Sequence, residues 1–216
     1  MNLSGKIALV TGASRGIGES LAIVLADHGT DVIICDLESE SKGLANTHKE
    51  IEKTGKKCWS YFLDVTKKSQ IQKMVSDILN DIGSIDILVN NAGILTPTPL
   101  EDIDEETWDS HFEVNTKGVL LMCQSVLPHM REKKFGRIIN IASIAGRQGS
   151  PTQGHYASTK SAVITLTRVL AQEVGEAGIT VNAICPGIIL TEMGKNNLGS
   201  EKAVSYTHLR AHETSN

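Results

Sequence analysis

The stretch that decides the fold is residues 7–18, IALVTGASRGIG. Its first half is a short apolar run typical of a buried strand, and its second half is a glycine-rich loop that leads into a helical pattern. Phosphate binding needs a tight turn, a backbone that a ligand can approach closely, and a helix N-terminus with free N–H groups. The spacing G-x-x-x-G-x-G is neither G-x-G-x-x-G nor a P-loop. Taken alone, the loop fits an ordinary strand-to-helix turn equally well.

Further apolar, β-branched runs follow at residues 32–35, 58–63, 85–89, 137–141 and 179–184. Helical patterns separate these runs. In the first of them, the spacing of a sheet-facing helix surface is shown by Ile17, Leu21, Val24 and Leu25. Six alternations of strand and helix indicate βαβ units and a parallel sheet that is covered on both faces. We predict an α/β fold, a Rossmann-type doubly wound parallel sheet in three α/β/α layers.

Helix boundaries are predicted from capping residues. Gly29 and Gly55 stand where the first two helices should stop. Asp104 precedes a long helical stretch that begins with two glutamates, and Pro128 should kink or end that stretch.

Composition excludes several classes of protein. The chain has 216 residues, 40% of them hydrophobic, and a formal net charge of -4, which argues against a nucleic-acid partner. No apolar run approaches the roughly 18 residues that cross a bilayer, so no membrane association is expected. The histidines lack a metal-ligand spacing, so we expect no metal site. A cytoplasmic protein with reduced thiols is indicated by the scattered Cys35, Cys58, Cys123 and Cys185.

Asp36 strengthens the dinucleotide interpretation of the glycine loop. It ends the second apolar run, eighteen residues after Gly18. A carboxylate there can accept hydrogen bonds from the adenosine ribose and would repel a 2′-phosphate, which favours NAD over NADP. Arg15 in the glycine loop is the counter-argument, because its guanidinium could pair with that phosphate.

Tyr156 and Lys160 lie four residues apart at the start of a helical stretch. An ammonium about 4 Å from a phenol favours the phenolate by roughly three pKa units, so Tyr156 is expected to titrate near 7 and to exchange protons with an alcohol or ketone. Ser143 and the Asn90–Gly93 segment follow other predicted strands, and the carboxyl ends of parallel strands meet at one crevice.

These motifs together resemble the classical short-chain dehydrogenase/reductase family over about residues 3–194. The resemblance rests on residues 11–18 and 90–93, and on Asp64, Asn115, Ser143, Tyr156, Lys160, Pro186 and Gly187. It implies that Tyr156 is the general acid/base and that Ser143 holds the substrate oxygen. It also implies that Lys160 contacts the nicotinamide ribose and lowers the pKa of Tyr156, while Asn115 sustains a water-linked proton relay.

The resemblance further implies which residues contact the nicotinamide cofactor. Asp64 would face the adenine, and Ile188 and Thr191 the carboxamide. The full set of expected cofactor contacts is Gly12, Ser14, Arg15, Gly16, Ile17, Gly18, Asp36, Asp64, Val65, Asn91, Ala92, Gly93, Tyr156, Lys160, Pro186, Gly187, Ile188 and Thr191.

The C-terminal end departs from the family pattern. Members usually have a seventh strand, a further helix and a homodimeric or homotetrameric assembly. We expect six of the seven strands within a single domain at residues 1–194, and an irregular, non-family tail at residues 195–216. The expectation is a C-terminally truncated chain whose assembly and stability are compromised.

The expected activity is hydride transfer between a nicotinamide cofactor and a secondary alcohol or ketone, a small molecule whose identity the residues leave open among polyols, 3-oxoacyl thioesters and steroids. The alternative is a catalytically impaired dinucleotide-binding fragment. A sugar-nucleotide epimerase shares the Tyr/Lys pair but needs a larger C-terminal substrate domain.

Overall fold

A computed structural model describes residues 3–189, 191, 193 and 194 of the chain. The strands are β1 (Ile7–Thr11), β2 (Asp31–Asp36), β3 (Cys58–Phe62), β4 (Ile87–Asn90), β5 (Gly136–Ile141) and β6 (Ile179–Ile184). The α-helices are α1 (Gly16–Asp27), α2 (Ser41–Lys53), α3 (Lys68–Asp81), α4 (Glu105–Phe112), α5 (Gly118–Lys133), α6 (Ala145–Gln148) and α7 (Gly154–Val174). Short 3-10 turns are η1 (Glu38–Glu40), η2 (Leu100–Asp102) and η4 (Gly175–Ala177), and η3 (Glu113–Lys117) is a π-helical turn between α4 and α5.

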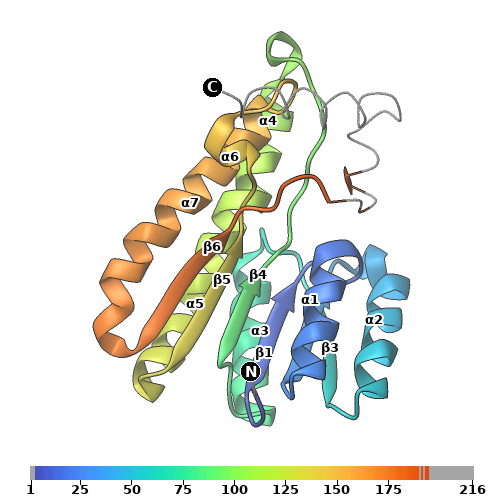
Figure 1. The fold of residues 1–216 in the computed structure, drawn as a ribbon, viewed down its shortest axis with the longest axis vertical. Coiled ribbons are helices and arrows are strands. Elements are labelled where there is room, and N and C mark those ends of the chain that lie inside the picture. The colour runs from blue at the N-terminus through green and yellow to red at the C-terminus, as the bar shows by residue number, and fades with distance from the viewer. Residues whose placement is uncertain (1–2, 190, 192, 195–216) are drawn as a thin grey trace, which may run out of the picture.

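The six described strands form one parallel sheet in the order β3-β2-β1-β4-β5-β6 (Figure 1). This is the doubly wound order, and it confirms the predicted fold class. The strand order reverses between the neighbouring strands β1 and β4, where Val10 pairs with Val89. Ligands of such sheets bind beyond the carboxyl ends of the strands at this point of reversal.

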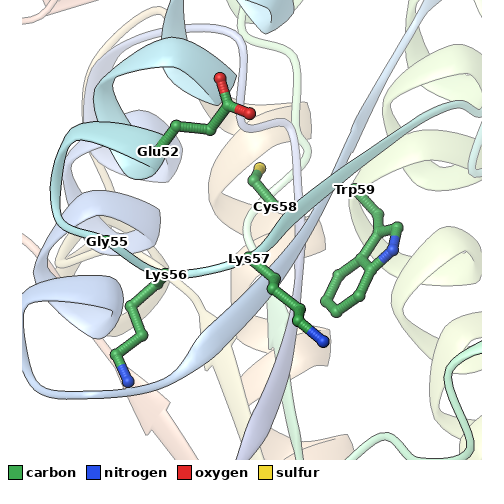
Figure 2. A pocket seen from close by; sticks show the side chains of 6 residues that line it. All are labelled: Glu52, Gly55, Lys56, Lys57, Cys58 and Trp59. Atoms are coloured by element: carbon green, nitrogen blue, oxygen red, sulfur yellow. The ribbon is translucent and has the colours of Figure 1, made fainter.

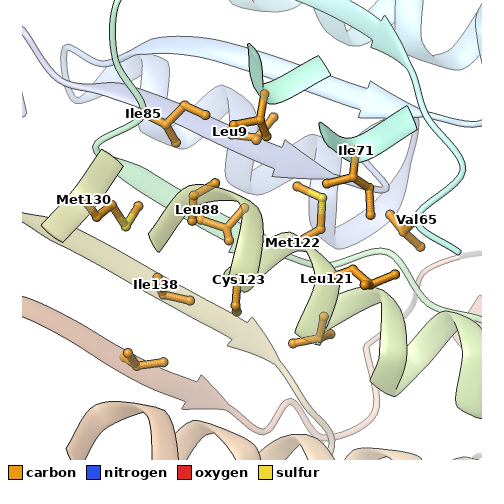
Figure 3. Packing of buried hydrophobic residues seen from close by; sticks show 14 of the residues in the cluster. Leu9, Val65, Ile71, Ile85, Leu88, Leu121, Met122, Cys123, Met130 and Ile138 are labelled. Carbon is orange, nitrogen blue, oxygen red and sulfur yellow. The ribbon is translucent and has the colours of Figure 1, made fainter. Parts of the chain in front are cut away.

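Two apolar cores lie on the two faces of the sheet. Leu9, Leu88 and Ile138 point to one face and pack against α3, α5 and α7 (Figure 3). Val10 and Ile34 point to the other face and pack against α1 and α2. Because successive strand residues alternate between faces, each buried strand supplies both cores, as the continuous apolar runs predict.

The predicted sheet-facing surface of α1 is wrong in one respect. Val24 is 50% exposed, whereas the fully buried positions are Gly18, Ala22 and Ala26. A Cβ at Gly18 would lie 2.2 Å from the Gly12 carbonyl oxygen, so this helix approaches the glycine loop too closely for large side chains on its inner face.

The helix ends agree with two of the predicted kinds of capping residue and differ at Pro128. Gly29 and Gly55 adopt positive φ angles of 101° and 80° just after α1 and α2, and the Asp104 carboxylate accepts a hydrogen bond from the Thr107 amide at the start of α4, as predicted. Pro128 does not end its helix, because α5 continues to Lys133. Its ring lies on the exposed side, where water can serve the carbonyl that loses its partner.

The expected tail, residues 195–216, lies outside the described residues. Among the helices that are described, none is long and apolar enough to cross a membrane.

Candidate active site

A cavity of about 1170 Å³ opens at the carboxyl ends of the strands. It brings together every predicted site residue except Gly18 and Asn115. Gly18 instead allows α1 to approach Gly12, and Asn115 lies fully buried behind the cavity wall. A smaller cavity of about 390 Å³ lies at the amino end of β3, away from the large cavity, and is lined by Glu52 and by residues 55–59 (Figure 2).

The glycine loop is joined to the loop after β4. The Thr11 hydroxyl accepts hydrogen bonds from the Asn91 and Ala92 amides, both at 3.0 Å. The Asn91 side chain donates back to the Thr11 and Gly12 carbonyls at 3.0 and 2.9 Å. Gly12 has a φ of +64°, and a Cβ there would lie 2.8 Å from the Ala92 Cα, so this junction requires glycine.

Two acidic side chains border the far end of the cavity. Asp36 accepts hydrogen bonds from the Ser14 and Leu37 amides, both at 2.9 Å, so its carboxylate is fixed beside the glycine loop. Glu40 forms an ion pair with Arg15 at 2.6 Å. Sequence reasoning missed Glu40, because no spacing signals that a residue of η1 reaches the glycine loop.

Asp64 and Thr191 lie at two other parts of the cavity wall. The Asp64 carboxylate accepts hydrogen bonds from the Thr66 amide and hydroxyl at 2.9 and 2.7 Å. Thr191 returns over the glycine loop, since a Cβ at Gly16 would lie 3.2 Å from its methyl group. The segment that begins at Pro186 is held by a 3.0 Å hydrogen bond from the Ile144 amide.

Ser143 and Tyr156 form the hydroxyl pair of the site. The Ser143 hydroxyl accepts a 3.1 Å hydrogen bond from the Ala145 amide and also hydrogen-bonds to Tyr156. Burial raises the pKa of Tyr156 above its ordinary value, and the Ser143 hydrogen bond opposes this rise only in part.

Lys160 is 4% exposed and donates a 2.8 Å hydrogen bond to the Ile141 carbonyl. Burial lowers its pKa from 10.5 to about 8. Its ammonium nitrogen lies 5.7 Å from the centre of the Tyr156 ring. The expected lowering of the Tyr156 pKa is wrong in this structure, because burial of the phenol is the largest influence on that pKa and the Ser143 hydrogen bond offsets it only in part.

Asn115 occupies the π-helical turn η3, a geometry often found at functional sites. Its amide accepts a 2.8 Å hydrogen bond from the Ile94 N–H and donates a 3.0 Å bond to the Ile94 carbonyl. A Cβ at Gly93 would lie 3.1 Å from the Asn115 oxygen and 3.4 Å from the Lys160 nitrogen. Gly93 thus lets these two side chains come close together.

Comparison with known proteins places this geometry in a family. The sequence profile described as short chain dehydrogenase matches residues 6–202. The chain belongs to the short-chain dehydrogenase family. Members of this family are oxidoreductases that bind a nicotinamide cofactor, which agrees with the glycine loop at the sheet reversal.

Two relatives illustrate the similarity, which extends over most of each protein's length. The 3-oxoacyl-(acyl-carrier-protein) reductase FabG of Staphylococcus epidermidis is 42% identical over 188 residues, which cover 87% of this chain and 77% of that protein. The oxidoreductase UcpA of Salmonella typhimurium is 41% identical over 195 residues, 90% of this chain and 73% of that protein.

Solved structures agree with the fold. The NAD+-bound xylitol dehydrogenase has a TM-score of 0.89 and 31% identity, covering 93% of this chain and 77% of that one. Levodione reductase has a TM-score of 0.86 and 34% identity, covering 90% of this chain and 76% of that one.

Proposed function

We propose that this short-chain dehydrogenase interconverts a secondary alcohol and a ketone, with Tyr156 as the general acid/base. The observation that carries the proposal is the Ser143–Tyr156 hydroxyl pair at the wall of the large cavity, with the buried Lys160 alongside. Two hydroxyl groups that donate to one substrate oxygen stabilise the negative charge that develops on a ketone as it is reduced.

The residues of the cavity fit a dinucleotide. The amino end of α1 and the glycine loop offer backbone N–H groups to a pyrophosphate, and Asp36 offers carboxylate oxygens to ribose hydroxyls. A bound nicotinamide cofactor would supply or accept the hydride. The described residues Lys160, Ile188 and Thr191 line the part of the cavity proposed for the nicotinamide and its ribose.

Proton transfer is assigned to Tyr156. Because burial raises the pKa of Tyr156, its phenol holds a proton at neutral pH and is ready to donate it to a ketone oxygen. Ser143 would hold that oxygen. Asn115 and Lys160 would belong to the relay that returns a proton to Tyr156. Carbonyl reduction is therefore the direction that these groups favour at neutral pH, and oxidation should become faster as the pH rises.

We propose NAD as the cofactor. Asp36 and Glu40 both border the cavity where a 2′-phosphate would need positive charge, and the guanidinium of Arg15, which lines the same part of the cavity, pairs with Glu40. This ion pair weakens the argument that Arg15 makes for NADP.

The substrate is proposed to be a small alcohol or ketone, and the polyol and 3-oxoacyl classes stay open. The relatives include a reductase of 3-oxoacyl groups and a dehydrogenase of xylitol by name. Four free cysteines among the described residues suit a reducing compartment, which supports a cytoplasmic location. The alternative of a binding fragment without turnover is not favoured, because Ser143, Tyr156 and Lys160 converge on the same cavity.

The test is Tyr156→Phe, with Tyr61→Phe on β3 as the control that removes the same oxygen outside the cavity. Turnover of a panel of ketones and alcohols is followed at 340 nm, and NADH binding is followed separately by fluorescence. We expect Tyr156→Phe to lose at least about a thousand-fold in kcat while NADH affinity stays within about two-fold. Substantial residual turnover in Tyr156→Phe would overturn the assignment.

A further inference from the structure

Two histidines lie buried beside the site without lining its cavity. His111, in the last turn of α4, is 2% exposed, and His155, the second residue of α7, is 0% exposed. Their rings meet edge to face, with centres 4.1 Å apart. Both contact the backbone of Thr96, in the segment that connects β4 to α4 (Figure 1).

The hydrogen-bond partners fix opposite tautomers for the two rings. His111 Nδ1 lies 2.7 Å from the Thr107 carbonyl, which can only accept, so Nδ1 carries the hydrogen and Nε2 accepts from the Thr96 amide at 3.2 Å. His155 Nε2 lies 2.9 Å from the Thr96 carbonyl and must donate to it. His111 is therefore neutral, and together the two rings satisfy both backbone groups of Thr96.

This contact belongs to a regular series along the segment. The backbone of Ile94 is held by Asn115 through both its N–H and its carbonyl. Two residues later Thr96 is held by the histidine pair, and two residues later again the Thr98 amide donates to the Thr152 carbonyl at 2.7 Å. The intervening Leu95 lines the cavity, as Ile94 does.

We propose that His111 and His155 are positioning residues that hold the segment 94–98 as one wall of the substrate part of the cavity. The inference rests on the proposed function, because the wall matters only if the cavity takes a substrate. His155 immediately precedes Tyr156, so the same pair ties the general acid/base to that wall. Neither histidine lines the cavity, so each acts through the backbone of Thr96.

One observation speaks against a purely packing role. His155 Nδ1 is buried and has no hydrogen-bond partner. An unpaired buried acceptor lowers stability, and an aliphatic side chain in its place would avoid that loss. The imidazole is explained by the hydrogen bond that its other nitrogen donates to Thr96.

Activity tests the pair through variants that keep or remove the bond. His155→Gln retains a donor near the Nε2 position, and His155→Leu does not. The control is His48→Leu, at a half-buried position of α2 that does not line the cavity. We expect His155→Leu to raise KM for the ketone about ten-fold, as for one lost hydrogen bond, with NADH affinity unchanged, and His155→Gln to restore KM to within about three-fold. Equal KM values for the Leu and Gln variants would overturn the proposal.

Two measurements test the pair without turnover, and so separate it from the proposed function. Imidazole ¹⁵N NMR of the full chain should show His111 as the Nδ1–H tautomer and His155 as the Nε2–H tautomer. Amide hydrogen exchange at Thr96 should be about ten-fold faster in His111→Leu than in the wild-type or the His48→Leu control. Identical tautomers, or unchanged exchange at Thr96, would refute the pair even if Tyr156→Phe behaves as expected.

Discussion

Replacing Lys160 with methionine should stabilise the folded chain at neutral pH while it abolishes turnover. Burial lowers the pKa of Lys160 to about 8, whereas the unfolded chain has the ordinary value of 10.5. Below pH 8 the folded protein therefore carries a buried charge that the unfolded chain would rather hold in water. Methionine has nearly the same shape and carries no charge.

The magnitude follows from two opposing contributions. A pKa difference of about 2.5 units corresponds to about 3 kcal/mol of destabilisation at pH 7, which methionine removes. Methionine also leaves the Ile141 carbonyl without the 2.8 Å hydrogen bond from Lys160, at a cost of about 2 kcal/mol. The variant should thus gain about 1 kcal/mol at pH 7, which raises Tm by about 2–4 °C in a chain of this size.

The sign of the difference should reverse with pH. The unfolded chain binds more protons at Lys160 than the folded chain between pH 8 and 10.5, so the wild type gains stability over this window. By pH 10 most of the charge penalty has gone, and the variant should be less stable than the wild type by about 1 kcal/mol. Urea unfolding at pH 7 and pH 10 measures this, with Lys49→Met on the exposed side of α2 as the control. A Lys160→Met variant that is less stable at both pH values by the same amount would refute the reasoning.

Three further outcomes are expected. Gly12→Ala should lower the free energy of unfolding by at least about 2 kcal/mol in urea, whereas Gly55→Ala, also at positive φ but with open space around it, should lose only about 1 kcal/mol. Glu40→Gln should raise NADPH affinity relative to NADH about five-fold by fluorescence titration, and adding Arg15→Ala should cancel this gain. Val24→Ala on the exposed side of α1 should change stability by less than about 0.5 kcal/mol, and a loss above 2 kcal/mol would contradict its exposure.

The sheet and most of the cavity wall were predictable because they depend on local patterns. Each strand is a short apolar run, and several candidate groups stand at or just after the end of such a run, where a parallel sheet collects its strand ends. Asp36, Asn91 and Ser143 therefore meet in one cavity although they are far apart in the chain. The roles of Gly12 and Asp104 could also be predicted, since a tight turn and a helix cap each need particular residues.

Other features depend on distances that no pattern contains. The inner face of α1 is set by its close approach to Gly12, which hydrophobic spacing does not report. The pKa of Tyr156 depends on how deeply the phenol is buried and on its hydrogen bond with Ser143. The partners of Glu40 and His155 come from segments that only the folded chain brings together.

The π-helical turn between α4 and α5 has a consequence for insertions and deletions. An α-helix turns by about 100° per residue, so removal of one residue from the turn Glu113–Lys117 would restore regular α-helix and rotate α4 by that angle relative to α5. This rotation would break the hydrogen bond between Asn115 and Ile94 and the one between His111 and Thr96. The extra residue of the π-helical turn thus sets the orientation of the side chains that hold segment 94–98. A deletion in this turn should therefore lower activity and stability far more than any single substitution on the exposed faces of α4 or α5.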